Sequence, residues 1–258
     1  MLVDAHVNFS HKDLIQDIDI IIREAKENKV NRLLAVNSNL YDFEKDLSLV
    51  DKYSFIDLSI GHHPCICKEI DLKELEEILD LHLTNNRGKI KVVGETGLDY
   101  SYDVPHINQI KSLELHIEKA IKFKLPILIH VRDAFDDLID ILSKHRRDLS
   151  NILIHCFTGD DNQAEKLIDL DCYFSITGIM TFKNADKLRN TIKKLPIEKI
   201  FFETDSPYLT PMPLRGKVNH PSFLRHIVEF YCQLTNQEFA KIADISTNNY
   251  ESFLSCQA

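Results

Sequence analysis

The sequence predicts an α/β fold, specifically an eight-stranded (β/α)8 barrel of the TIM type. Short runs of β-branched and large apolar residues recur eight times, and longer segments with apolar residues at helical spacing lie between them. Uninterrupted apolar strands are typical of a parallel sheet covered on both faces, and strict alternation of strand and helix requires parallel crossovers. The length of 258 residues also suits one such barrel, which commonly needs about 250.

The strands are placed where short apolar runs are bounded by polar or turn-forming residues. In chain order these runs cover residues 2–6, 32–36, 55–61, 91–95, 127–130, 151–155, 173–176 and 199–204. Apolar residues three and four apart predict helices between them, over residues 14–27, 72–83, 107–124, 135–145 and 162–170. The tail from residue 221 onwards predicts two or three further helices.

An open, doubly wound sheet is the alternative architecture for the same alternation. That fold usually carries a glycine-rich phosphate-binding turn after its first strand, whereas this chain has only seven glycines and no G-x-G-x-x-G or P-loop pattern. No linker, repeat or break in composition divides the sequence. We therefore expect one domain over residues 1–258.

Composition and charge exclude several classes of protein. A hydrophobic content of 44% excludes a disordered or low-complexity chain. The 31 Lys and Arg residues against 40 Asp and Glu give a formal charge of −9 at pH 7. An acidic surface repels phosphate, which disfavours a protein that coats long nucleic acid duplexes but leaves room for a local basic pocket.

Cysteine usage and hydropathy indicate a cytoplasmic protein with no membrane partner. The six cysteines are scattered and mostly apolar in context, which favours buried reduced thiols: Cys65, Cys67, Cys156, Cys172, Cys232 and Cys256. Cys65 and Cys67 form the only close pair, and a lone C-x-C does not complete a zinc knuckle. Polar residues interrupt the first apolar run, and no stretch approaches the roughly eighteen apolar residues of a membrane span. No protein partner can be deduced.

Polar residues close most of the predicted strands, and this is where barrel enzymes place their chemistry. In strand order they are His6 and Asn8, His62 and His63, Glu95 and Asp99, His130, His155, and Glu203 with Asp205. Because residues two apart in a strand share a face, His6 and Asn8 can both point into the barrel mouth, as can Glu203 and Asp205.

Each of these residues also has an ordinary structural explanation. A single histidine at a strand end is more often a hydrogen-bonded rim residue than a metal ligand, and Glu95 or Asp205 could cap the helix that follows. The conjunction of three imidazoles and two carboxylates at five strand ends is harder to explain in this way. Burying two anions together without a cation costs several kcal/mol, so the pattern predicts a metal site.

Imidazole and carboxylate donors are suited to Zn, Mn, Mg, Fe or Ni, and the absence of a thiolate ligand disfavours a purely structural zinc site. With five or six ligands available, one carboxylate can bridge two ions. Pairs of this kind activate water near neutral pH and neutralise charge on a phosphoryl or carbonyl group. The predicted reaction class is therefore metal-assisted hydrolysis.

Longer motifs surround these residues and span nearly the whole chain. They are Val3-Asp4-Ala5-His6, Gly61-His62-His63-Pro64, Gly94-Glu95-Thr96-Gly97-Leu98-Asp99, Ile129-His130-Val131-Arg132-Asp133, Ile154-His155-Cys156-Phe157-Thr158-Gly159 and Glu203-Thr204-Asp205-Ser206-Pro207-Tyr208-Leu209. Together they resemble the TatD family of metal-dependent hydrolases, among the amidohydrolase-like barrels. The resemblance implies a TIM barrel of the metallo-dependent hydrolase type.

The resemblance also implies a role for each matching position. His6 would bind the first of two divalent ions, Glu95 would bridge both, and His130 with His155 would hold the second. Asp205 would bind the first ion and act as the general base toward the attacking water, with Glu95 as the second catalytic carboxylate.

His63 stands where the family has a histidine before proline. It would contact the substrate phosphate or the leaving group, although a loop residue made rigid by Pro64 explains it equally well.

One position departs from the family pattern. Where the family has His-x-His after the first strand, this chain has His6-Val7-Asn8. The neutral carbonyl of Asn8 is a weaker ligand than imidazole, so the first ion should bind less tightly, with Mg or Mn favoured and Zn possible. The change also allows a weakened or non-catalytic relative.

Members of the family are described as deoxyribonucleases, often trimming single-stranded DNA from the 3′ end, and some relatives deacylate mischarged tRNA. The resemblance therefore implies a deoxyribonuclease with short or single-stranded DNA as its partner. The alternative is a hydrolase of another bond, such as an aminoacyl-tRNA ester or a small phosphoester.

Cationic residues near the strand ends are candidates for substrate binding. Arg215 and Lys217 are expected to contact phosphate, because loops after the seventh and eighth strands usually bind phosphate in such barrels. Arg132, two residues past His130, is a similar candidate. The alternative for Arg132 is a salt bridge to neighbouring carboxylates. A further cationic run more often forms a solvated helix face: Lys183, Lys187, Arg189, Lys193 and Lys194.

Overall fold

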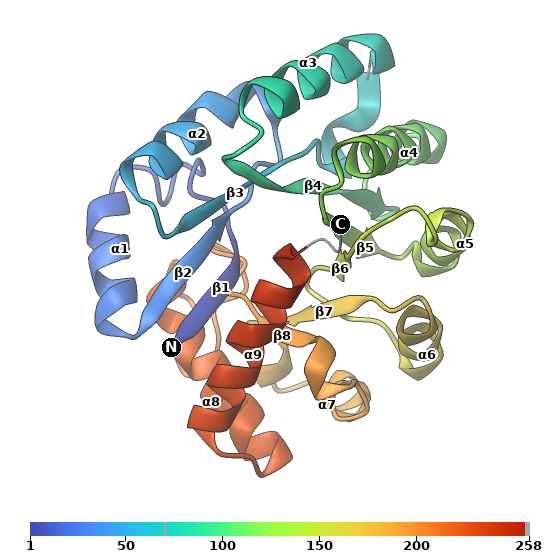
Figure 1. The fold of residues 1–258 in the computed structure, drawn as a ribbon. Coiled ribbons are helices and arrows are strands. Elements are labelled where there is room, and N and C mark those ends of the chain that lie inside the picture. Colours follow the sequence, from blue (N-terminus) through green and yellow to red (C-terminus); the bar gives the residue numbers. More distant parts are fainter. Residues whose placement is uncertain (70, 256–258) are drawn as a thin grey trace.

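Eight parallel strands form one sheet whose spatial order follows the sequence, and the sheet curls into a barrel (Figure 1). The computed structural model describes residues 1–69 and 71–255. The predicted α/β barrel is confirmed, with strands β1 (Leu2–Val7), β2 (Val30–Ala35), β3 (Ile56–Ile60), β4 (Ile90–Asp99), β5 (Ile127–Arg132), β6 (Ile152–Ile154), β7 (Tyr173–Ile176) and β8 (Ile200–Phe202).

Helices cover the outside of this barrel. Seven follow the first seven strands, namely α1 (Ile18–Glu27), α2 (Phe43–Lys52), α3 (Leu72–Asn85), α4 (His106–Phe123), α5 (Phe135–His145), α6 (Asp161–Asp169) and α7 (Asp186–Ile192). The tail forms a short 3-10 turn and two helices, α8 (Leu224–Thr235) and α9 (Phe239–Leu254), as expected. Helix α1 begins four residues later than predicted, because residues 11–17 form turns.

Strand β4 is longer than predicted, while β6 and β8 are shorter. Two glycines explain the length of β4, because a Cβ atom on Gly94 or Gly97 would collide with the carbonyl oxygen of Leu128 or His130 on β5. Without side chains there, β4 stays paired with β5 as far as Asp99. The early ends of β6 and β8 leave His155 and Asp205 on the segments just beyond the strands.

The barrel closes between β1 and the segment that follows β8. Main-chain hydrogen bonds join Asn8 N to Ser206 O at 3.0 Å and Asp205 N to His6 O at 3.1 Å. The buried carboxylate of Asp4 also accepts hydrogen bonds from Thr204 N at 2.8 Å and Thr204 Oγ1 at 2.6 Å. Side-chain hydrogen bonds therefore help to join β1 to the segment after β8, whereas the other neighbouring strands are joined by regular main-chain ladders.

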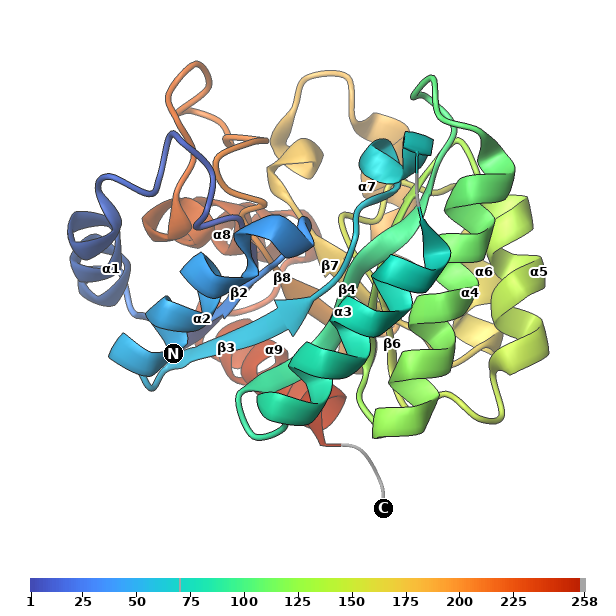
Figure 2. The same cartoon turned by 90° about the horizontal axis from the view of Figure 1, so that it is seen from above.

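The inside of the barrel and the space under the helices are two separate apolar cores. The inner core is closed at the lower end by α9 (Figure 2). Tyr250 and Phe253 of this helix pack against Tyr173 and Phe201. Tyr250 also donates a hydrogen bond of 3.0 Å to Asp57. The loops that follow the strands lie at the opposite end of the barrel (Figure 2).

Five of the six cysteines lie in the described part of the chain, and all five are free thiols, as expected. Cys256 lies outside the described residues, as does the end of the expected 1–258 domain, so that domain boundary stays a prediction. Among the described residues, no helix has the length and apolarity needed to cross a membrane.

Truncation of the α9 plug should destabilise the fold. Phe253 is fully buried between the rings of Tyr173 and Phe201, so Phe253→Ala leaves a cavity and should cost about 3–5 kcal/mol. Urea denaturation followed by circular dichroism measures this as a lower midpoint. Leu81→Ala, an exposed position on α3, is the control and should change stability by less than about 0.5 kcal/mol. Equal midpoints for the two variants would contradict the assigned role of the plug.

Candidate metal centre at the mouth of the barrel

The loop end of the barrel holds a cavity of about 1420 Å³ whose floor contains predicted metal-binding residues. Glu95 and His130 come from β4 and β5, while His155 and Asp205 come from the segments after β6 and β8. His6 lies beneath the floor on β1 and is fully buried. The structure thus brings together residues that are up to two hundred positions apart in the sequence.

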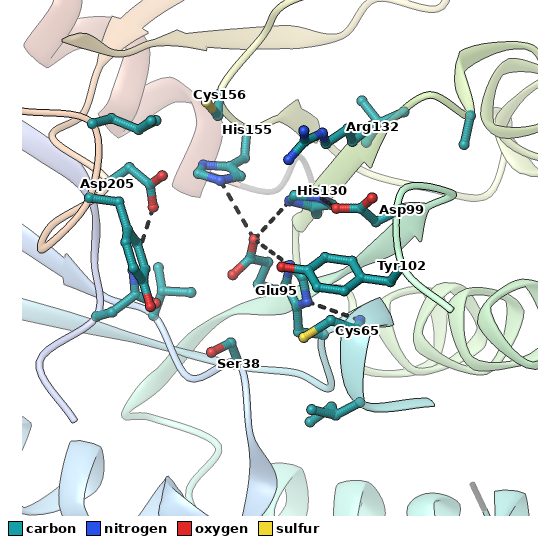
Figure 3. A pocket seen from close by; sticks show the side chains of 18 of the residues that line it. Ser38, Cys65, Glu95, Asp99, Tyr102, His130, Arg132, His155, Cys156 and Asp205 are labelled. Carbon is teal, nitrogen blue, oxygen red and sulfur yellow. Dashed lines mark hydrogen bonds and ion pairs between the residues drawn. The ribbon is translucent and has the colours of Figure 1, made fainter. Parts of the chain in front are cut away.

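Glu95 is the centre of this arrangement (Figure 3). Its Oε1 atom lies 3.3 Å from His130 Nδ1, 3.5 Å from His155 Nε2 and 3.5 Å from His63 Nε2. Its Oε2 atom lies 3.5 Å from His6 Nε2. One buried carboxylate therefore faces four imidazoles that come from four different strand ends.

These distances fit residues that share a cation better than residues that bond directly to each other. A tetrahedral site with metal–ligand bonds of about 2.1 Å has edges of about 3.4 Å, which exceeds an ordinary hydrogen bond. Both ring nitrogens of His6 are buried without a hydrogen-bond partner, although buried polar atoms are normally satisfied. Nitrogen and carboxylate donors in this number suit a divalent ion, so the chain's residues fit the metal that the sequence predicts.

His63 joins this cluster more closely than the sequence indicated. Its side chain is nearly buried, and it forms one of the candidate ion-binding groups together with Glu95 and His130. Main-chain geometry holds the ring, since Cys65 N donates a 3.1 Å hydrogen bond to His63 Nδ1. Nε2 is thereby left to face Glu95. The predicted contact of His63 with substrate stays a prediction, and the geometry makes His63 a candidate metal ligand as well.

Asp205 faces the same space from the opposite side, with Oδ1 3.7 Å from His6 Nε2. Asn8 contacts it through the amide nitrogen, which donates at 3.5 Å to Asp205 Oδ1 and at 3.0 Å to Ser206 O. This orientation holds the Asp205 segment against β1. The ligand role of Asn8 stays a prediction, and the structure shows it supporting Asp205.

Two further carboxylates lie behind the histidines. Asp99 Oδ2 lies 2.9 Å from His130 Nε2, and Glu203 Oε1 lies 2.8 Å from His155 Nδ1. Each contact occupies the ring nitrogen that faces away from Glu95. The sequence placed both residues at strand ends but assigned neither a role in the site.

The mutual field of these groups shifts their pKa values strongly. Burial lowers the pKa of His155, but Glu203, Glu95 and Asp205 outweigh burial and raise it to about 10. Burial lowers the pKa of His6 to about 4, helped by the neighbouring His155. Burial raises the pKa of Asp205 to about 7, with Glu203 and Glu95 adding to the shift. Asp205 is therefore suited to exchange a proton near neutral pH.

The three cationic candidates for substrate binding have different positions. Arg132 lines the cavity beside His130 and has no ion-pair partner in the described part of the chain (Figure 3). Arg215 and Lys217 do not line it. The guanidinium of Arg215 lies 4.1 Å from the ring centre of Phe182, and both side chains are exposed. Their predicted phosphate contacts are not seen in the cavity and stay predictions.

Asn219, two residues after Lys217, has a structural role. This buried side chain donates hydrogen bonds of 2.8 Å to Thr204 O and 2.6 Å to Tyr208 O. Asn219 therefore fastens the loop after β8 to the segment that carries Asp205.

Binding of a divalent ion should stabilise the protein through Glu95. An ion that binds only the native state at a concentration of 100 times its Kd adds about 2.7 kcal/mol. We expect Mn²⁺ to raise the Tm of metal-stripped wild-type protein, and Glu95→Gln to remove most of that rise, because it deletes the charge shared by four imidazoles. Glu77→Gln, an exposed carboxylate on α3, should behave like wild type. Equal shifts in all three proteins would exclude Glu95 as a ligand.

Loss of the carboxylate behind His130 should weaken ion binding without unfolding the protein. Removal of partners of this kind typically costs 10- to 100-fold in metal affinity. Asp99→Asn keeps the shape of the side chain but not its charge, and titration calorimetry with Mn²⁺ should show a loss in this range. Asp103→Asn, a fully exposed position in the next loop, serves as the control. If Asp99→Asn binds as tightly as this control, Asp99 does not position His130.

Comparison with known proteins agrees with this geometry. A family model described as TatD related DNase matches residues 3–255. A relative named as an uncharacterized metal-dependent hydrolase of Buchnera aphidicola is 37% identical over 263 residues, with 97% of this chain and 98% of the relative covered. The metal-dependent hydrolase YabD of Bacillus subtilis, also named as uncharacterized, is 34% identical, with 96% and 97% covered.

Solved structures show the same fold. The crystal structure of YjjV, a TatD homologue from Escherichia coli, matches with a TM-score of 0.92 and 26% identity, covering 98% of this chain and 97% of that one. A TatD family hydrolase from Entamoeba histolytica matches with a TM-score of 0.87 and 21% identity, with the same coverage. The match over residues 3–255 and the identities above 30% across nearly the full length show that the chain belongs to the TatD family.

Proposed function

We propose that this member of the TatD family is a metal-dependent phosphodiesterase that hydrolyses short or single-stranded DNA, from the 3′ end. The names of its relatives support a metal-dependent hydrolase, and the description of the family model supports a nuclease. The observation that carries the proposal is the cavity itself. Its floor is formed by Asp205 and by Glu95 with the histidines around it, here called the Glu95 cluster (Glu95, His63, His130 and His155, with His6 beneath them). Its wall presents the unpaired guanidinium of Arg132.

The proposal includes two ion sites that share Glu95. His6 and Asp205 would complete the first, and His130 with His155 the second, as the family resemblance implies. Two divalent ions, with Mg²⁺ or Mn²⁺ favoured over Zn²⁺, would neutralise charge on the phosphate and lower the pKa of a water molecule. We place this activity in the cytoplasm, since the described cysteines are all free thiols.

Asp205 moves the proton in the proposed reaction. As water attacks phosphorus, the carboxylate of Asp205 accepts its proton, and the P–O bond to the leaving oxygen breaks. The same proton then passes to that leaving oxygen, which balances the reaction. Asp205 lies at the cavity beside Glu95 and His6, where it can reach the attacking water, while Arg132 orients the phosphate from the cavity wall.

Cleavage of a labelled oligonucleotide tests the proposal. We expect metal-stripped protein to shorten a 5′-labelled single-stranded 20-mer one nucleotide at a time once Mg²⁺ or Mn²⁺ is added. Asp205→Asn removes the proton acceptor and should lower kcat by about 10²- to 10⁴-fold. Asp244→Asn, at an exposed position on α9, should retain full activity.

Two results would contradict the nuclease. The first is turnover of an aminoacyl ester or a small phosphoester with no cleavage of DNA, which would assign the same site to another bond. The second is no turnover of any substrate with any ion. In that case Asn8→His, which restores the histidine of the family pattern, would reveal a centre weakened at its first ion site if activity then appeared.

A further inference from the structure

Two tyrosines at the mouth of the cavity are left half exposed. Tyr102 lies in the loop between β4 and α4, Tyr208 follows β8, and their exposed fractions are 48% and 52%. Their hydroxyl groups make no hydrogen bond with any described residue. Tyr100, also at this rim, is engaged by contrast, because its hydroxyl bonds to Asp137 and its ring stacks on His106 at 3.5 Å. The ring faces of Tyr102 and Tyr208 are thus available to a ligand.

The two rings lie on opposite sides of the Glu95 cluster. Figure 3 shows Tyr102 beside His130 and Cys65, with Asp205 across the cavity from it. Tyr208 belongs to the Asp205 side, because its main-chain nitrogen donates a 2.9 Å hydrogen bond to Asp205 O. Its ring is held edge-on against His11, with 5.4 Å between the ring centres. A ligand that covers both rings must therefore pass over the floor of the site.

Each tyrosine has a free cation near its side of the cavity. Among the described residues that line it, the only Lys and Arg side chains are Lys12, next to His11, and Arg132, at the end of β5. Neither has an ion-pair partner in the described chain. Most acidic side chains of the same rim are engaged by neighbours, namely Asp42 by Lys45, Asp46 by Ser10 and Asn37, Asp99 by His130, Asp136 by Lys166 and Asp137 by Tyr100.

We infer that the cavity binds a single-stranded polynucleotide with one unpaired base stacked on Tyr102 and another on Tyr208. The reacting phosphate lies between them over the Glu95 cluster, and Arg132 and Lys12 contact the phosphates on either side. This inference rests on the proposed function, in which the reacting group is a phosphodiester.

The chemistry of the rim selects this class of ligand. Every base has an aromatic face, so stacking on tyrosine holds a strand without reading its sequence. Bases in a duplex are already paired and stacked on each other, so they cannot stack on the two tyrosine rings. A small phosphoester would reach Glu95 without covering either ring. The unpaired Lys12 and Arg132 offset the overall charge of −9 where the strand would lie.

Replacement of each tyrosine tests the inference. For a single-stranded 12-mer with Mn²⁺, we expect Tyr102→Ala and Tyr208→Ala each to lower kcat/KM by about 5- to 150-fold, mainly through KM, as loss of one stacked base requires. Tyr102→Phe and Tyr208→Phe keep the ring and should stay within about twofold of wild type. The control is Tyr41→Ala, because Tyr41 is 78% exposed and lies outside the cavity lining.

A modified substrate separates stacking from a structural role of the rings. A 12-mer in which one nucleotide beside the cleaved bond carries hydrogen in place of its base should lose affinity for wild-type protein. The matching Tyr→Ala variant should show no further loss with this substrate, because ring and base act as a pair. Additive losses would overturn the inference even if both variants fold normally.

The salt dependence of affinity tests the predicted phosphate contacts of Arg132 and Lys12. Each phosphate contact to single-stranded DNA contributes about 0.7 to the slope of log affinity against log salt. Arg132→Ala and Lys12→Ala should each reduce this slope, whereas Arg147→Ala, at an exposed position before β6, should leave it unchanged.

The results of these experiments distinguish a failure of the stacking inference from a failure of the proposed nuclease activity. If wild type cleaves the 12-mer and both Tyr→Ala variants match Tyr41→Ala, the stacking is overturned while the nuclease stands. If wild type cleaves no oligonucleotide with any ion, the proposed function fails first.

Discussion

The burial of one carboxylate among four imidazoles is the constraint on which the rest of this structure depends. Glu95 can face His6, His63, His130 and His155 only because β1, β3, β4, β5 and β6 end at the same rim. The glycines on either side of Glu95 serve the same purpose, since they let β4 approach β5 without side-chain collisions. Barrel closure next to Asp4 then fixes the Asp205 segment opposite Glu95.

Charge explains why this arrangement calls for a cation. Asp99 lies behind His130 and Glu203 behind His155, so two of the four imidazoles each add a further buried carboxylate to the centre. Together with Glu95 and Asp205, the centre carries more negative than positive charge at neutral pH. Burial of unpaired charge is costly, and protonation of His155 relieves only part of it. A bound divalent ion completes the balance, which links stability of the folded barrel to its chemistry.

Local sequence pattern predicted the residues that close the strands but not how their neighbours are arranged. The runs ending at His6, Glu95, His130 and His155 were recognisable because strand ends in a parallel barrel share one rim. The position of His63 depends on the 3-10 turn at Pro64–Glu69, and that of Arg215 on a contact with the distant Phe182. Lys12 is a single lysine in a loop, and no short-range pattern distinguishes it from any other exposed lysine.

The acidic composition is compatible with the proposed phosphate substrate because of where the unpaired cations lie, which composition alone does not show. Net charge averages over a surface on which most acids at the cavity rim are already engaged by hydroxyl, amide, lysine or imidazole groups. Arg132 and Lys12 have no such partners, so two unpaired cations are available to phosphate at a cavity that is otherwise acidic. The acidic surface disfavours long duplexes, whereas a flexible strand can place its phosphates at these two cations.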